Sequence, residues 1–240
     1  MTAVPLWGQP PNPLALPAGV VHLWQVALDQ PAEAITLSDD EQARAARFVF
    51  ERDRRRYVAA RSALRAILAP YLSIRPDALR FQYNEHGKPA VPNTAVQFNL
   101  SHSHELALVA VTREAEVGVD VEHLRPVDDL AALAARNFSA RENARWATVA
   151  PAQQRHAFFN AWTRKEAYLK ALGSGLAVPL DEFDVSLAPD EPAALLAVRG
   201  AEDEAAHWTL HAFTPAPGYV GAVALRATGV RFQYWCWSPA

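Results

Sequence analysis

Residues 158–176 read FFNAWTRKEAYLKALGSGL, and this stretch carries the clearest helix signal in the chain. Its apolar residues recur at helical spacing, so one face can pack against a core. Glu166 and Lys170 lie one turn apart on another face. Gly173 follows the pattern and can take the left-handed conformation that ends a helix. The stretch predicts a long helix over about residues 154–172.

Strand patterns lie on both sides of this helix in the sequence. Residues 106–122, LALVAVTREAEVGVDVE, indicate two strands joined by a polar turn. VVHLWQVAL near the start and the alternating HWTLHAF and GAVALRA near the end indicate further strands. Helical patterns begin at Ser38, which can cap the first amides, and at about residue 51, from where a helix is expected to run to Leu72. Together these patterns predict an α+β fold of antiparallel strands with a few helices.

The sequence also contains a weak internal repeat. Residues 45–56, AARFVFERDRRR, resemble residues 134–146, AARNFSARENARW. Residues 60–68, ARSALRAIL, can be aligned with residues 164–172, RKEAYLKAL. An alignment that puts Arg61 opposite Glu166 and Arg65 opposite Lys170 would give cationic roles to one half and metal-binding roles to the other. Similarities of this strength also arise by chance between helices rich in alanine and arginine.

Length and composition leave the number of domains open. The chain has 240 residues, enough for one large domain or two small ones. Its residues are 50% hydrophobic and 20% charged, a balance typical of a globular protein. If the internal repeat is real, it predicts two similar lobes, residues 1–114 and 115–240, with a site between them.

The net charge and the cysteine content exclude several classes of protein. A net charge of −3 gives no overall field for nucleic acid, so a local basic pocket must hold any anionic ligand. The single cysteine, Cys236, excludes an internal disulfide framework and a cysteine-based zinc site. The first residues lack the features of a secretion signal, and no stretch approaches the ~18 apolar residues of a membrane helix. We therefore expect a soluble cytoplasmic protein with neither nucleic acid nor a membrane as partner.

Two acidic residues interrupt an apolar strand pattern. Asp120 and Glu122 lie in VGVDVEHL, where a spacing of two points both side chains to one face. Two like charges side by side are costly unless a cation neutralises them. Oxygen ligands without a cysteine or histidine cluster favour Mg²⁺. The alternative is a strand at a sheet edge that simply turns its acids to solvent.

The helix can supply the rest of such a site. Glu166 and Lys170 could form an ordinary helical ion pair, which contributes little to stability. Beside the two strand carboxylates, they would instead complete a site for a metal and a pyrophosphate. In that arrangement the lysine stabilises charge that develops on a leaving group.

A third motif offers groups suited to phosphate. It reads GKPAVPNTAVQFNLSHSHELAL, in which Lys88 lies in a glycine-proline turn that offers backbone amides and a cation. Ser101 and His102 close an expected strand and provide hydroxyl and imidazole donors. His102 and His104 alone are a weak zinc signal, so we expect His102 to contact phosphate and assign no role to His104.

Taken together, GKP, FNLSHS, GVDVE and WTRKEAYLKALGSGL occur in the order and spacing of a known family. From about residue 48 to residue 180 the chain resembles the Sfp-type 4′-phosphopantetheinyl transferases. The resemblance implies two similar α+β lobes related by a pseudo-twofold axis, with coenzyme A in the cleft between them. It also implies a monomer that modifies apo acyl or peptidyl carrier proteins and depends on Mg²⁺.

The resemblance further implies a role for each matching residue. The magnesium ligands would be Asp120, Glu122 and Glu166, with Glu166 also the base for the carrier serine. Lys170 would contact the pyrophosphate. Lys165 would add positive charge near the phosphates. The nucleotide end of coenzyme A, with its 3′-phosphate, would be held by Arg56, Arg61, Lys88, Ser101 and His102. The serine oxygen would attack the β-phosphate and release 3′,5′-ADP.

The chain departs from the family pattern in one segment. Where relatives place lysines before the first long helix, this chain has the acidic residues 39–41, and Arg44 and Arg47 come only afterwards. Two other functions remain open from sequence: a non-catalytic module that binds coenzyme A or a carrier protein, and a metal hydrolase of the coenzyme A pyrophosphate. The complete set of acidic residues argues against the first, and the lack of a glutamate-dense Nudix helix argues against the second.

Overall fold

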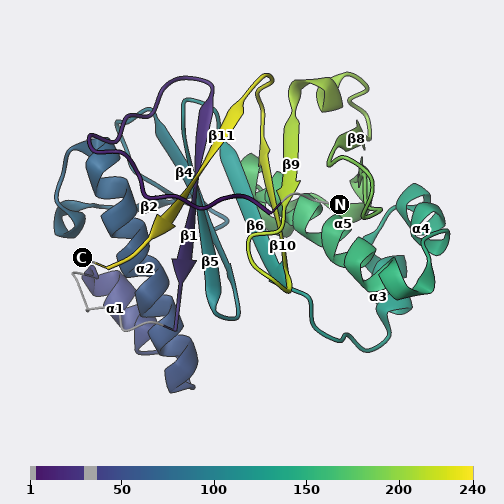
Figure 1. The fold of residues 1–240 in the computed structure, drawn as a ribbon, viewed down its shortest axis with the longest axis horizontal. Coiled ribbons are helices and arrows are strands. Elements are labelled where there is room, and N and C mark those ends of the chain that lie inside the picture. The colour runs from purple at the N-terminus through teal and green to yellow at the C-terminus, as the bar shows by residue number, and fades with distance from the viewer. Residues whose placement is uncertain (1–3, 30–36, 240) are drawn as a thin grey trace.

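The computed structural model describes residues 4–29 and 37–239. Two sheets lie next to each other in the middle of the molecule, with helices on both outer sides (Figure 1). In order across the first sheet, its strands are β11 (Arg231–Trp237), β1 (Val20–Ala27), β5 (Leu106–Arg113) and β4 (Val96–Ser103). In order across the second, they are β6 (Val117–His123), β10 (Tyr219–Leu225) and β9 (Thr209–Phe213). All strand pairs are antiparallel except that of β1 with β11.

Two helices cover the first sheet. The shorter, α1 (Asp39–Ala45), begins after Ser38, as predicted. The longer, α2 (Glu51–Leu72), has the bounds that its apolar pattern predicts and ends at Ser73 in the left-handed conformation. After α2, the small hairpin of β2 (Gln82–Tyr83) and β3 (Pro89–Ala90) carries the predicted glycine-proline turn.

The second sheet is covered by a long helix and its neighbours. The helices here are α3 (Leu130–Asn137), α4 (Ala140–Ala147) and α5 (Pro151–Leu172). A small sheet of β7 (Phe183–Val185) and β8 (Leu195–Val198) lies beside them. Short 3-10 helices cover Pro76–Ala78, Gly175–Ala177, Leu180–Glu182 and Glu204–His207.

Helix α5 begins and ends for local reasons. Pro151 lies in its first turn, where the missing N–H costs nothing, so the helix starts earlier than its apolar pattern predicts. It ends at Gly173, whose φ of 68° is the left-handed conformation expected there. In β6, a Cβ added to Gly118 would lie 2.1 Å from the Ala167 carbonyl oxygen. A glycine at this position therefore lets α5 approach the strand that carries the predicted metal ligands.

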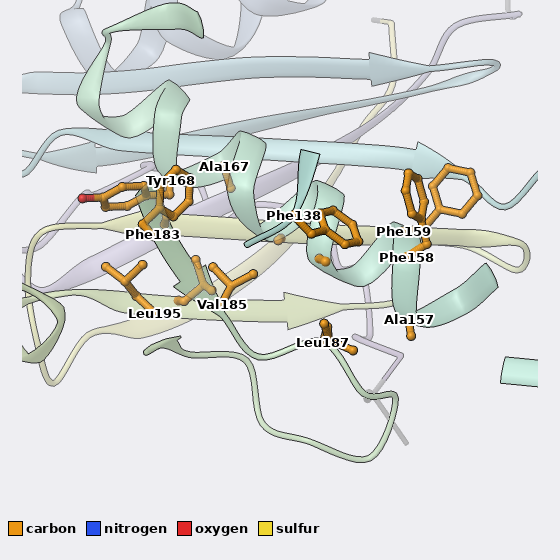
Figure 2. Close-up of a cluster of buried hydrophobic side chains, with 14 of the residues drawn as sticks. Phe138, Ala157, Phe158, Phe159, Ala167, Tyr168, Phe183, Val185, Leu187 and Leu195 are labelled. Atoms are coloured by element: carbon orange, nitrogen blue, oxygen red, sulfur yellow. The ribbon is translucent and has the colours of Figure 1, made fainter. Parts of the chain in front are cut away.

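The apolar cores lie between these layers. Figure 2 shows the core packed against α5, where aromatic side chains of α5 and β7 meet Phe138, the residue after α3. The rings of Phe138 and Phe158 are 5.1 Å apart, and those of Tyr168 and Phe183 are 4.7 Å apart. Another core joins the inner faces of the two sheets, with residues such as Leu108 and the valines of β6. The site below is thus built on elements that are packed on at least one side.

The observed fold confirms the α+β prediction and adds details that the patterns missed. Two shorter helices, α3 and α4, follow β6, and Ser139 starts α4 with a capping box. Strand β11 pairs with β1, so the first sheet contains a segment from the last residues of the chain. The division into lobes at residues 114 and 115 stays a prediction. No helix within the described residues combines the length and the apolar character needed to cross a membrane.

Candidate functional site

Asp120 is the centre of a buried hydrogen-bond cluster at the meeting of β4, β6 and α5. Its Oδ1 accepts hydrogen bonds from the Ser101 hydroxyl at 2.8 Å and from the Lys170 ammonium at 2.5 Å. Lys170 also donates to the Ser101 Oγ at 3.0 Å. The other oxygen, Oδ2, is buried and has no hydrogen-bond partner among the residues that the structure describes. A buried carboxylate oxygen without a donor is costly in isolation, so this atom is suited to a ligand.

Two further carboxylates lie near Asp120. Glu122, two residues along β6, accepts hydrogen bonds from Ser103 at 2.9 Å and Arg125 at 3.1 Å. Glu166 projects from α5 and is half-buried. Burial, followed by the negative charges of Asp120 and Glu122, raises the pKa of Glu166 above its usual value, while Lys170 opposes the shift. Glu166 is thus within electrostatic reach of both carboxylates on β6.

The carboxylates predicted to bind a metal lie near one another, but they are not grouped around a single position for a metal ion. Among residues 4–29 and 37–239, no three histidine, cysteine, aspartate or glutamate side chains are gathered closely enough to hold a metal ion as they stand. Instead, Lys170 supplies the positive charge next to Asp120. A cation would therefore bind only after the side chains turn toward it.

Lys88 reaches the same region from the β2–β3 hairpin. Its ammonium donates to the Ala171 carbonyl at 3.0 Å and pairs with Glu116 at 3.3 Å. Burial lowers the pKa of Lys88, and Glu116 opposes that shift. Lys88 lines a cavity of about 280 Å³ together with Glu166 and Lys170. The structure thus brings the predicted glycine-proline turn and the catalytic candidates to one cavity.

Arg56 and His102 lie at the exposed side of the cluster. Arg56 forms a two-pronged ion pair with Asp29, with distances of 2.7 and 2.8 Å. His102 follows Ser101 on β4 and is exposed. Partial enclosure of its ring, followed by the charges of Lys170 and Arg56, lowers the pKa of His102, so its neutral form is favoured. A neutral imidazole beside two cations can still donate one hydrogen bond to an anion.

Arg61 is buried in an internal ion pair. Its guanidinium bonds Glu41 at 2.6 Å and the Tyr83 hydroxyl at 3.0 Å. The prediction that Arg61 contacts coenzyme A therefore needs a phosphate that displaces Glu41 or reaches Arg61 past Tyr83. The side chain as it stands is structural.

The structure places the Lys165 ammonium among partners outside the cluster, and its phosphate contact stays a prediction. Its ammonium pairs with Glu142 at 2.7 Å and donates to the Leu180 and Phe183 carbonyls. Lys165 is fully buried. Adjacent residues on a helix point about 100° apart, so Lys165 and Glu166 lie on different sides of α5.

A basic cavity and a serine were given no role by the motifs. A cavity of about 840 Å³ lies between α1, α2 and the β2–β3 hairpin. Its lining includes Arg44, Arg47, Tyr57 and Tyr83. The sequence shows both arginines, but only the fold shows that they face a cavity beside the glycine-proline turn. Ser103, which bonds Glu122, was missed as well, although it lies two residues from Ser101 just as Glu122 lies two from Asp120.

Comparison with known proteins gives matches along nearly the whole chain. The family model described as the 4′-phosphopantetheinyl transferase superfamily matches residues 116–224, and that described as 4′-phosphopantetheinyl transferase, N-terminal, matches residues 22–114. The 4′-phosphopantetheinyl transferase HetI of Nostoc sp. is 42% identical, over 95% of this chain and 96% of HetI. The chain belongs to the 4′-phosphopantetheinyl transferase family. This confirms the resemblance inferred from the four motifs.

Other members are more distant from this transferase. The 4′-phosphopantetheinyl transferase Sfp of Bacillus subtilis is 28% identical over 64% of this chain and 68% of Sfp. The holo-[acyl-carrier-protein] synthase of Thermotoga maritima, a solved structure, is 21% identical over 48% of this chain and 64% of its own, with a TM-score of 0.36.

Proposed function

We propose that this transferase moves the phosphopantetheine arm of coenzyme A to a serine of an apo acyl or peptidyl carrier protein. The observation that carries the proposal is the cluster of Lys170, Ser101 and Asp120 next to Glu166. It combines a cation for a pyrophosphate, an unpartnered carboxylate oxygen and a candidate base. A module that only binds coenzyme A has no need of the unpartnered oxygen of Asp120.

The donor set fits a magnesium ion. Asp120, Glu122 and Glu166 offer hard oxygen atoms, and Mg²⁺ prefers carboxylates together with water and phosphate oxygens. The Asp120 Oδ2 already lies buried without a donor. These three carboxylates would hold the ion, which would neutralise charge on the pyrophosphate when bound.

The cations around the cluster are suited to the anionic parts of coenzyme A. Lys170 and Lys88 line one cavity and would contact the pyrophosphate. The 3′-phosphate would lie toward Arg44 and Arg47 in the larger cavity, where Tyr57 and Tyr83 offer aromatic surface to the base. Arg56, Ser101 and His102 would complete the nucleotide site. Arg61 would support it indirectly through Tyr83.

The chemical step then needs a base and a held leaving group. The serine oxygen forms a bond to the β-phosphorus, the bond from that phosphorus to the nucleotide oxygen breaks, and 3′,5′-ADP leaves with the electron pair. The serine proton passes to Glu166, directly or through water, and the raised pKa of Glu166 suits it to accept that proton. Lys170 stabilises the charge on the leaving group. The protein thus contributes mainly positioning and charge neutralisation.

Intact-protein mass spectrometry tests this proposal. An apo carrier protein is incubated with the chain, coenzyme A and Mg²⁺, with EDTA as a control. A gain of one phosphopantetheine arm that EDTA prevents is the expected result. No gain across several carrier proteins, despite binding of coenzyme A, would favour the non-catalytic module. We further propose that the chain acts as a monomer in the cytoplasm, which native mass spectrometry and cell fractionation would check.

A further inference from the structure

A row of polar side chains joins the two sheets beside the proposed metal site. Strands β4 and β6 belong to different sheets, and no strand pairing links them within the described part of the chain. Asn99, Ser101 and Ser103 are alternate residues of β4, so their side chains share one face. All three are buried. Side-chain hydrogen bonds therefore connect β4 to β6 where a backbone ladder would connect two strands of one sheet.

The first two members of the row bind successive residues of β6. The Asn99 Oδ1 accepts a hydrogen bond from the Val119 N–H at 2.9 Å. The Ser101 hydroxyl donates to Asp120 Oδ1 at 2.8 Å and accepts from Lys170 at 3.0 Å. Ser101 thus occupies one oxygen of Asp120 and leaves the other, Oδ2, without a partner.

Ser103 repeats this arrangement one step along the strands. The His123 N–H can only donate, so the Ser103 Oγ accepts its hydrogen bond, at 3.1 Å. The hydroxyl proton of Ser103 is then free to go to Glu122 Oε2, at 2.9 Å. Arg125 donates to that same oxygen at 3.1 Å. The second oxygen of Glu122 receives neither of these donors.

We infer that Ser103 is a positioning residue that fixes Glu122 for metal binding. By holding Oε2 on the β4 side, its hydroxyl would limit rotation of the Glu122 carboxylate and leave Oε1 available to a cation. The inference rests on the proposed function, because it concerns the metal site described above. Ser103 acts through Glu122 and does not itself touch the substrate. Groups that orient a metal ligand in this way commonly change metal affinity by about tenfold or more when removed.

The test compares Ser103→Ala with Ser103→Thr, which keeps the hydroxyl. Ser62→Ala is the matched control, because Ser62 is also buried and its hydroxyl has no hydrogen-bond partner. Mn²⁺ serves as the probe, and its binding to the protein with coenzyme A is followed by electron paramagnetic resonance of the free ion. Calorimetry measures coenzyme A binding without metal.

We expect Ser103→Ala to raise the dissociation constant for Mn²⁺ by about tenfold. Ser103→Thr should restore most of the affinity, and Ser62→Ala should leave it unchanged. Binding of coenzyme A without metal should stay within about twofold in all variants, because Ser103 is placed at the carboxylate rather than at the nucleotide. A purely structural role would instead weaken both ligands together.

Each contrary result has a separate meaning. Unchanged Mn²⁺ affinity in folded Ser103→Ala overturns the inference, as does an equal loss of Mn²⁺ and coenzyme A affinity. If Ser103→Ala does not fold, Ser103→Cys replaces it, since a thiol of similar size is a weak donor, and the same increase is expected. Failure of the wild-type chain to transfer the arm rejects the proposed function itself. A wild type that transfers the arm, beside a Ser103→Ala variant of equal Mn²⁺ affinity, rejects only the role of Ser103.

Discussion

Each of the two long helices, α2 and α5, forms a buried ion pair with the capping-box glutamate of a shorter helix that precedes it. Before α2, Ser38 and Glu41 form a capping box, and the buried Glu41 binds Arg61 at 2.6 Å and Arg65 at 2.7 Å. Two side chains of α2 thereby attach α1 to the long helix. Arg65 is held further by the carbonyl oxygens of Pro76 and Leu79.

On the other side, α4 is attached to α5 by one ion pair. Ser139 and Glu142 form the capping box, and the buried Glu142 binds Lys165 at 2.7 Å. The Val185 N–H also donates to Glu142, at 2.8 Å. Both halves therefore bury a capping-box glutamate against a cation of the long helix, but only the first glutamate has two cations.

The contacts of the cations show which of them are alike. Lys165 donates to the Leu180 and Phe183 carbonyl oxygens, and Arg65 donates to those of Pro76 and Leu79, so Lys165 matches Arg65 in its contacts. The alignment of the internal repeat, which puts Arg61 opposite Glu166, stays a prediction. Of the two long helices, α5 carries Glu166 and Lys170, which line the cavity of the proposed site.

The largest expected effect distinguishes α5 from α2 at the proposed base, Glu166. Glu166→Gln keeps the size of the side chain but removes the base, so turnover should fall by about 10²–10⁴-fold. A control change in α2, Ser62→Ala, should leave turnover near the wild-type value, because the buried Ser62 hydroxyl has no hydrogen-bond partner among the described residues. Initial rates of arm transfer, with circular dichroism to check folding, measure both. Near-normal turnover in a folded Glu166→Gln variant would contradict the division of roles.

The next largest effect is on the free energy of unfolding, and it distinguishes Lys165 from Arg61. Lys165→Met leaves Glu142 buried without its only ion-pair partner among the described residues, so the free energy of unfolding should fall by about 3–5 kcal/mol. Arg61→Met should cost less, roughly 1–3 kcal/mol, because Glu41 keeps Arg65. Urea denaturation measures both values. Equal losses would mean that the second arginine adds nothing to the anchor.

Coenzyme A binding then tests whether Lys165 contacts a phosphate. A folded Lys165→Met variant, measured where unfolding is negligible, should bind coenzyme A within about twofold of wild type, because its ammonium faces Glu142. A loss of tenfold or more would support the phosphate contact that the sequence suggested.

The sequence predicted what depends on local pattern. The bounds of α2, the end of α5 at Gly173 and the two strands before Asp120 follow from apolar periodicity and a glycine signal. The sequence also predicted that Asp120 and Lys170 share one site, because their motifs occur in the order found in the family. The direction of Lys165 could not be predicted, because its partner Glu142 lies on another helix. Nor could the pairing of β11 with β1, which joins residues from opposite ends of the chain.

The smallest expected effect is the change in stability with pH that the two buried glutamates, Glu41 and Glu142, cause. Burial alone would raise the pKa of Glu41, but Arg61, the Ser38 N–H and Arg65 hold it below the ordinary value. Burial raises the pKa of Glu142 above that value, although Lys165 opposes the shift. At Glu142 the effect of burial exceeds that of its single cation, whereas at Glu41 the two arginines and the Ser38 N–H together exceed it.

These opposite shifts predict opposite pH dependences. For Glu41 the unfolded chain binds the proton more readily, so its contribution is complete above the unfolded pKa and is lost as pH falls through the lowered folded value. For Glu142 the folded chain binds the proton more readily, so its contribution decreases as pH rises from the unfolded pKa through the raised folded value. Urea denaturation between about pH 3.5 and about pH 7 should therefore show the stability advantage of wild type over Glu41→Gln shrinking in acid. Its advantage over Glu142→Gln should grow in acid, and changes of the same sign in both variants would mean that the two anchors are electrostatically alike.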